Sequence, residues 1–157
     1  MTESPNTDKP SIEKPSIEKL PDDDFRRVLC VAAHPDDMEY GSSAAVAEWT
    51  DRGVEVAYLL LTKGEAGMQI PPDECARIRR GEQERACEQV GVAELTMLDH
   101  PDGMLVYSLD IRRDIARRIR QFKPDAVVTS ADGSFKVAPS VDGLDIDAEA
   151  APAVPSM

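Results

Sequence analysis

Short apolar segments alternate with segments of helical period between residues 26 and 130, and this alternation constrains the fold more than any other feature. Four segments have the length and apolar content of buried strands, and three carry apolar residues at helical spacing. The predicted strands are 28–32, 54–61, 95–98 and 125–129, and the predicted helices are 42–52, 71–90 and 108–122. Such alternation forms right-handed βαβ units and a parallel sheet. The sequence therefore predicts an α/β fold: Rossmann-like, three-layer α/β/α, with a mostly parallel sheet that is incomplete at the C-terminal end.

The ends of the predicted helices carry residues that start or stop helices. Gly53 and Gly91 follow the first two helices, where glycine is favoured because it accepts a left-handed backbone. Pro72 lies at the start of the second helix, and Ser108 is expected to cap the third. These signals fix the helix limits to within a few residues.

Polar residues with metal-binding chemistry follow the first strand directly. His34, Asp36 and Asp37 come two to five residues after the apolar run that ends at Ala32. Imidazole and carboxylate are donors that Zn²⁺ accepts, and a catalytic zinc site keeps one position open for water. We expect His34 and Asp37 to share one ion from a non-helical turn, with Asp36 placed to take a proton from the bound water. An acidic turn with a structural role, or one that binds Mg²⁺, is the alternative.

Each of the four predicted strands ends in a polar loop. Ligands of parallel α/β sheets bind beyond the carboxyl ends of the strands, so four such loops on one edge would build a single site. The loops are 34–39, 62–67, 99–103 and 129–133. In the second loop, Gly64 and Gly67 let the backbone approach other groups closely.

The segment Ala33-His34-Pro35-Asp36-Asp37-Met38-Glu39 resembles the signature of the LmbE-like (PIG-L) family of zinc-dependent N-deacetylases. The resemblance implies that His34 and Asp37 bind Zn²⁺ and that Asp36 is the general base. Arg79, in an Arg-x-x-Glu element on the second helix, and Asp102, in a Pro-Asp-Gly turn, are implied to contact the substrate. That substrate would be a small-molecule N-acetylated glycoconjugate of the amino-sugar type.

The chain departs from the family pattern after about residue 130. Family members carry a later histidine block that completes the zinc site, whereas this chain has only two histidines, His34 and His100. His100 is thus the sole candidate for a third nitrogen ligand. We interpret the chain as truncated relative to the family, and we expect weak or absent activity because a lost ligand weakens zinc binding.

Composition divides the chain into three parts. Residues 1–24 contain a duplicated Lys-Pro-Ser-Ile-Glu and are expected to form a disordered polar tail. Residues 25–130 form the predicted deacetylase domain, and residues 131–157 are expected to be an aberrant or disordered tail. Three cysteines without close spacing indicate reduced core thiols.

Charge and hydropathy bear on partners and location. The formal net charge of −12 argues against nucleic acid or an anionic membrane as the main partner. No apolar run approaches the roughly 18 residues of a membrane span, so a cytoplasmic protein is expected.

Two other functions compete with the enzyme. A signalling receiver module also has an acidic pair after its first strand and an aspartate after its third, which Asp36, Asp37 and Asp99 could mimic. A non-catalytic remnant is the second competitor, and its exposed sheet edge would favour self-association.

Overall fold

The computed structural model describes residues 22–131 and 134–139, with side chains for residues 22–129. Its strands are β1 (Arg27–Ala32), β2 (Glu55–Leu60), β3 (Glu94–Met97), β4 (Ala126–Ala131) and β5 (Ser134–Pro139). Its helices are α1 (Asp37–Gly41), α2 (Ser43–Asp51), α3 (Pro72–Gln89) and α4 (Leu109–Phe122). All four predicted strands and all three predicted helices are therefore present, with limits that differ by at most two residues.

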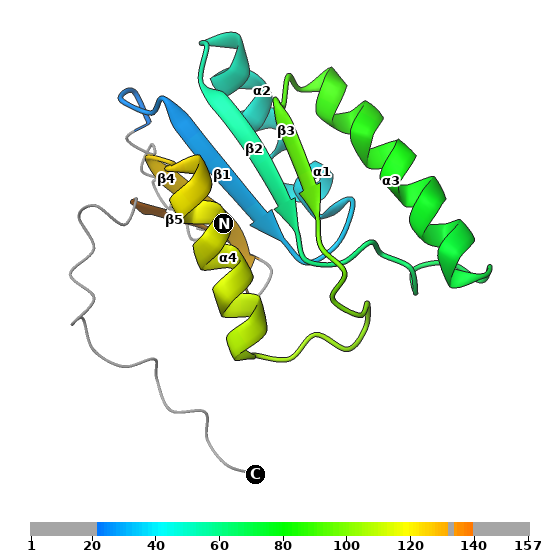
Figure 1. Ribbon diagram of the computed structural model, residues 1–157. Coiled ribbons are helices and arrows are strands. Elements are labelled where there is room, and N and C mark those ends of the chain that lie inside the picture. The colour runs from blue at the N-terminus through cyan, green and yellow to red at the C-terminus, as the bar shows by residue number, and fades with distance from the viewer. Residues whose placement is uncertain (1–21, 132–133, 140–157) are drawn as a thin grey trace, which may run out of the picture.

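The strands form one sheet in the order β3-β2-β1-β4-β5 (Figure 1). Neighbouring strands from β3 to β4 are parallel, so β1 lies in the middle of four strands that run in the same direction. The carboxyl ends of these strands therefore share one edge of the sheet, as the sequence predicted. Ala32, the last residue of β1, is paired with Leu60, the last residue of β2.

Strand β5 is a difference from the sequence interpretation, which placed residues 131–157 in a tail. The structure pairs Ser134–Pro139 with β4 in antiparallel register. Asp132-Gly133 separates the two strands in the sequence, and an Asp-Gly pair between strands is a strong hairpin signal that the interpretation did not use. Residues 140–157 lie outside the described residues, so the remainder of that prediction stays a prediction.

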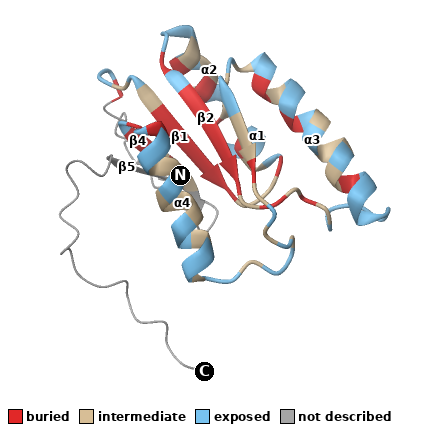
Figure 2. Ribbon diagram, viewed as in Figure 1, coloured by how far each residue is buried: buried red, intermediate tan, exposed pale blue. Residues whose placement is uncertain are grey.

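Helices cover both faces of the sheet, which confirms the predicted three layers. Along β1 the residues alternate between two clusters. Val28, Cys30 and Ala32 face α1, α2 and α3, whereas Leu29 and Val31 face α4. Because both faces are covered, the central strands are buried along nearly their whole length (Figure 2). No helix within the described part of the chain has the length and apolar content that crossing a membrane requires.

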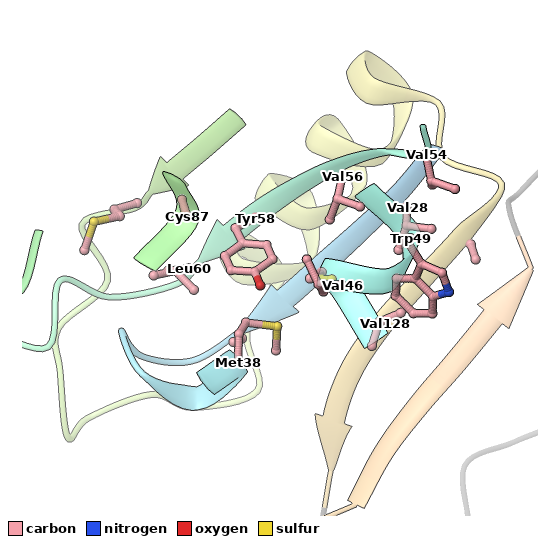
Figure 3. Packing of buried hydrophobic residues seen from close by; sticks show 14 residues of the cluster. Val28, Met38, Val46, Trp49, Val54, Val56, Tyr58, Leu60, Cys87 and Val128 are labelled. Carbon is pink, nitrogen blue, oxygen red and sulfur yellow. The ribbon is translucent and has the colours of Figure 1, made fainter. Parts of the chain in front are cut away.

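The larger cluster joins the short helix after β1 to the rest of the core. Figure 3 shows Met38 of α1 beside Tyr58 of β2, with Val46 and Trp49 of α2 packed along the same face. Met38, Val46 and Tyr58 have almost no exposed surface. This packing anchors α1, and with it the turn that carries the predicted metal ligands.

The start of the fold lies earlier than the sequence indicated. Asp22 is buried, and its carboxylate accepts hydrogen bonds from the Trp49 indole (2.6 Å) and from Arg52 (2.8 Å). The indole hydrogen bond, helped by Arg52, lowers the pKa of Asp22. Asp22 thus belongs to the folded domain, although the interpretation placed residues 1–24 in a tail; residues 1–21 lie outside the described residues.

The three cysteines are buried and free, as predicted. Burial raises the pKa of Cys30 to about 12 and that of Cys87 to about 11. The Cys75 thiol donates to the carbonyl oxygen of Gly64 at 3.2 Å. These thiols therefore act as core side chains.

Candidate metal and catalytic site at the end of strand β1

The carboxylate of Asp37 folds the segment after β1 back on itself. Its Oδ2 accepts hydrogen bonds from the backbone N–H groups of Ala33 (3.1 Å) and His34 (2.9 Å). The same oxygen lies 3.5 Å from Nδ1 of His34, and both side chains are partly exposed. Two ligands of one tetrahedral zinc ion, with bonds of about 2.0–2.1 Å, lie roughly 3.3 Å apart. The structure therefore brings the two predicted metal ligands together at a suitable spacing.

Asp102 contacts the other nitrogen of the His34 ring. Its Oδ1 lies 3.1 Å from Nε2, and its Oδ2 accepts a hydrogen bond from the backbone N–H of Ala66 at 2.9 Å. The backbone N–H of Asp102 donates in turn to Glu65. Only 8% of the Asp102 side chain is exposed. Metal-binding histidines usually donate their second ring N–H to such a carboxylate, which fixes the ring orientation.

The predicted substrate contact of Asp102 stays a prediction. Both carboxylate oxygens of Asp102 are already engaged within the protein, one with His34 and one with Ala66. The sequence indicated neither of these partners.

Asp36 has a left-handed backbone, with a φ of 82°, and precedes helix α1. Its carbonyl oxygen accepts hydrogen bonds from the N–H groups of Glu39 (3.0 Å) and Tyr40 (3.3 Å). Asp37 is thus the first helical residue, whereas a non-helical turn was expected. The expectation failed because α1 is only one turn long and gives no periodic signal. The Asp36 side chain is 53% exposed.

Arg79 of α3 reaches across to the same segment. Its Nη2 donates to the carbonyl oxygen of Pro35 and to Oδ2 of Asp36, both at 2.7 Å. Only 13% of its side chain is exposed. The sequence indicated that Arg79 and Glu82 would project to one side of the helix, whereas the ion pair that Arg79 forms is with Asp36.

Gly64 and Gly67 make room for Arg79. A Cβ atom on Gly67 would lie 2.1 Å from Nη1 of Arg79, and one on Gly64 would lie 2.8 Å from its Nε. Gly64 also has a positive φ of 66°. The close backbone approach expected in this loop is therefore present, and the group approached is Arg79.

A hollow of about 280 Å³ lies beside Asp36. Its lining includes Arg79, Glu39 and Glu82, together with the apolar side chains of Met68 and Ala86. Binding pockets for small molecules have volumes from about 300 Å³ upward and combine apolar walls with a few polar groups. The hollow is thus near the lower limit for a small ligand and opens next to the predicted base.

Two other candidate residues are engaged elsewhere. Nε2 of His100 lies 3.1 Å from Asp114 of α4, and the exposed Asp99 forms an ion pair with Lys63, which lowers the pKa of Asp99. Among the side chains that the structure describes, no three His, Cys, Asp or Glu residues form a group suited to a metal ion. Among these described side chains, His100 therefore completes no such group, and Asp36, Asp37 and Asp99 do not form the acidic metal group that the receiver alternative needs.

The sequence interpretation missed Gln83 of α3. Its side chain is buried, accepts a hydrogen bond from the backbone N–H of Asp36 at 3.0 Å and donates to Glu39 at 2.9 Å. The available signal was its spacing of four residues from Arg79, which places both on one helix face. No other feature of the sequence distinguishes Gln83 from the charged residues around it in the helix.

Comparisons with known proteins identify the family of this chain. Residues 29–137 match the family model of PIG-L, described as GlcNAc-PI de-N-acetylase. The chain is 36% identical over 111 residues to the diacetylchitobiose deacetylase of Thermococcus kodakarensis, covering 69% of this chain and 42% of that protein. It is 41% identical over 85 residues to the 1D-myo-inositol 2-acetamido-2-deoxy-alpha-D-glucopyranoside deacetylase of Kineococcus radiotolerans, covering 50% of this chain and 24% of that protein.

The fold is similar to that of the N,N'-diacetylchitobiose deacetylase from Pyrococcus horikoshii, solved with an inhibitor. The TM-score is 0.66 at 35% sequence identity, covering 68% of this chain and 41% of that chain. The chain thus spans less than half the length of these relatives. The family match covers well over half of the 157 residues and reaches into β5. On these grounds the chain belongs to the PIG-L (LmbE-like) family, whose relatives are named deacetylases.

Proposed function

We propose that this chain carries part of a zinc-dependent site that removes an N-acetyl group from an amino-sugar glycoconjugate. The observation that carries the proposal is the 3.5 Å spacing between Nδ1 of His34 and Oδ2 of Asp37 at the carboxyl end of β1. Asp36 lies between these two residues in the sequence, is half exposed and lines the hollow. The reaction is that of the deacetylase relatives, and the residue roles are those that the family resemblance implies, supported by this geometry.

The described donors fit two ligand positions of a zinc ion. His34 and Asp37 would hold the ion, with Asp102 orienting the imidazole through Nε2. A zinc ion bound there would supply a Lewis acid that polarises the acetyl carbonyl and makes water more acidic. The partial exposure of both side chains would leave the ion accessible to substrate.

Asp36 is the proposed general base. Its carboxylate takes a proton from the attacking water, whose oxygen forms a bond to the acetyl carbonyl carbon. The amide C–N bond then breaks, and the proton held at Asp36 passes to the leaving nitrogen. One water is consumed, and the products are acetate and the free amino sugar. Arg79 would hold the Asp36 carboxylate beside the hollow through its hydrogen bond to Oδ2. Because Arg79 also lines the hollow, we propose substrate contact as its second role.

The substrate class follows from the names of the relatives. Diacetylchitobiose and the inositol conjugate of 2-acetamido-2-deoxyglucose both contain an acetamido sugar. We propose the same group as the part that this site recognises. The hollow beside Asp36 has charged and apolar walls, which suit a sugar ring with polar edges and apolar faces.

We further propose that the chain by itself binds zinc weakly and turns over slowly. Only His34 and Asp37 fit as ligands among the described side chains, and structural and catalytic zinc sites use at least three protein ligands. The same observation favours the second candidate, a non-catalytic member of the family.

A cytoplasmic location and self-association stay predictions. Sizing the purified chain by light scattering tests the self-association.

Zinc titration and acetate release on the purified chain test the function. We expect His34→Ala and Asp37→Ala to abolish zinc binding. Asp36→Asn should retain it and slow acetate release from diacetylchitobiose about 100- to 10,000-fold. Zinc binding that is unaffected by both alanine variants would contradict the metal site. Stoichiometric tight zinc with rapid turnover would contradict the weak-binding proposal, and tight zinc with no acetate release would favour the non-catalytic candidate.

A further inference from the structure

One peptide group in the site is bound at both of its polar atoms by a single helix. Arg79 Nη2 donates to the carbonyl oxygen of Pro35 at 2.7 Å, and Gln83 Oε1 accepts from the N–H of Asp36 at 3.0 Å. These two atoms belong to the same Pro35–Asp36 peptide bond. Because Arg79 and Gln83 are four residues apart, both project from one face of α3. We call this pair the Arg79–Gln83 clamp.

The clamp acts on a strained residue. Asp36 has a φ of 82°, a left-handed conformation that costs free energy for residues other than glycine. Such a conformation persists only when surrounding contacts impose it. The N–H of Asp36 and the C=O of Pro35 belong to one rigid peptide plane. By binding both groups, the clamp holds this plane in the orientation that the left-handed backbone of Asp36 requires.

Gln83 is itself held in place. Its side chain is 3% exposed, and its Nε2 donates to Oε1 of Glu39 at 2.9 Å while Oε1 accepts from Asp36. Turning the amide over would place its N–H₂ against the N–H of Asp36 and its oxygen against the carboxylate of Glu39. The two partners therefore select one orientation of the amide, in which it can serve Asp36 only as an acceptor.

We propose that Gln83 is a positioning residue that fixes the Asp36 backbone and so aims its carboxylate. Gln83 lines the hollow beside Asp36, and it acts on the backbone N–H, whereas Arg79 also contacts the Asp36 carboxylate. The catalytic consequence rests on the proposed function of Asp36; the geometric part does not. The direction of the Asp36 carboxylate relative to the reacting water would then depend on Gln83 of α3, which is more than 40 residues from Asp36 in the sequence.

Four variants separate the hydrogen bonds of Gln83 from its packing. Gln83→Met keeps the volume and removes the hydrogen bonds to Asp36 and Glu39, together with the longer one from Nε2 to Sγ of Cys87 at 3.9 Å. Gln83→Glu keeps an acceptor for the Asp36 N–H but opposes the carboxylate of Glu39. The double variant Glu39→Gln/Gln83→Glu reverses the polarity, because the amide introduced at position 39 can donate to the carboxylate introduced at position 83. Glu88→Gln changes an exposed residue of the same helix and serves as the control.

Amide hydrogen exchange measured by NMR on the full chain is the primary readout. In Gln83→Met we expect the Asp36 amide to exchange at least tenfold faster while the amides of β1 keep their protection. We expect intermediate loss in Gln83→Glu, recovery to within threefold in the double variant, and no change in Glu88→Gln. Unchanged Asp36 exchange in Gln83→Met overturns the inference, as does a double variant that exchanges as fast as Gln83→Met.

Acetate release separates this inference from the proposed function. If both hold, kcat falls about 10- to 100-fold in Gln83→Met with KM within threefold, and the double variant recovers. Faster Asp36 exchange with unchanged kcat supports the clamp and overturns Asp36 as the base. Lower kcat with unchanged exchange overturns the clamp and leaves the role of Asp36 standing.

Discussion

Oδ1 of Asp102 lies 3.1 Å from Nε2 of His34, which joins the loop after β3 to the turn after β1. The other oxygen of Asp102 accepts from the N–H of Ala66, in the loop after β2. One nearly buried carboxylate thus connects three of the loops at the edge of the sheet. Because Nε2 of His34 faces Asp102, Nδ1 is left facing Asp37, as the proposed binding of one ion by these two side chains would need.

Asp102→Asn should weaken zinc binding roughly 10- to 100-fold. The two contacts of Asp102 use different oxygens, and asparagine replaces one of them with an NH₂ group, so the side chain cannot accept from both Ala66 and His34 in this geometry and the imidazole loses its fixed orientation. Isothermal titration with zinc measures the change. Asp99→Asn, at an exposed residue paired with Lys63, is the matched control and should leave zinc affinity unchanged. Equal zinc affinity in the Asp102→Asn variant and the unmodified chain would show that Asp102 does not orient His34.

Gly67→Ala should expel Arg79 from its place beside Asp36, because the added Cβ would lie 2.1 Å from Nη1. Losing the charged hydrogen bonds to Pro35 and Asp36 should lower the free energy of unfolding by about 1–2 kcal/mol, measured by urea denaturation.

The control for that variant is Gly81→Ala, inside α3. The nearest atom to its added Cβ is 3.5 Å away, so the methyl group fits. Helix interiors prefer alanine by about 0.5–1 kcal/mol, and this variant should be more stable than the unmodified chain. Two variants of equal stability would indicate that the loop around Gly67 moves to accept the side chain.

Acid should destabilise the chain partly through Asp22. The Trp49 indole and Arg52 lower the pKa of Asp22 in the folded state. Its contribution is therefore present above the unfolded pKa of about 3.9 and is lost as the pH falls towards the folded value. In Asp22→Asn, we expect the urea midpoint to fall less between pH 5 and pH 3 than in the unmodified chain. The fluorescence of the single tryptophan reports unfolding, and exposed Asp24→Asn should retain the full decrease.

The core thiols should resist modification in the folded chain. Burial raises the pKa of Cys30 to about 12 and that of Cys87 to about 11, so at pH 8 neither forms appreciable thiolate, which is the reactive species. We expect Ellman's reagent to react with all three thiols in 6 M guanidinium and about 100-fold more slowly in buffer. An unfolded thiol ionises near pH 8.5, whereas the buried thiols of Cys30 and Cys87 stay protonated to higher pH. Raising the pH from 8 to 10 therefore favours the unfolded state and should lower the urea midpoint. Rapid reaction of one thiol in the folded chain would contradict its burial.

Local sequence signals were sufficient for most of the fold. Ser108 caps α4 as predicted, and its hydroxyl accepts from the N–H of Ile111 at 3.3 Å. Gly53 and Gly91 have positive φ angles just after α2 and α3. These outcomes depend on a few adjacent residues, so the sequence carries them completely. Helix α1 was missed because one turn is too short for a periodic pattern to reveal. Strand β5 was missed because the Asp132-Gly133 hairpin signal before it was not used.

The sequence by itself determined that His34 and Asp37 would lie at the end of a buried parallel strand, because alternation and the adjacent ligand-type residues are local. Only the tertiary structure decided that Asp102 contacts His34, that Arg79 binds Asp36, and that the buried Gln83 holds the Asp36 backbone. These partners come from loops and helices 40 to 70 residues away. Their contacts depend on how the elements pack to within a fraction of an ångström, and no local pattern encodes that distance.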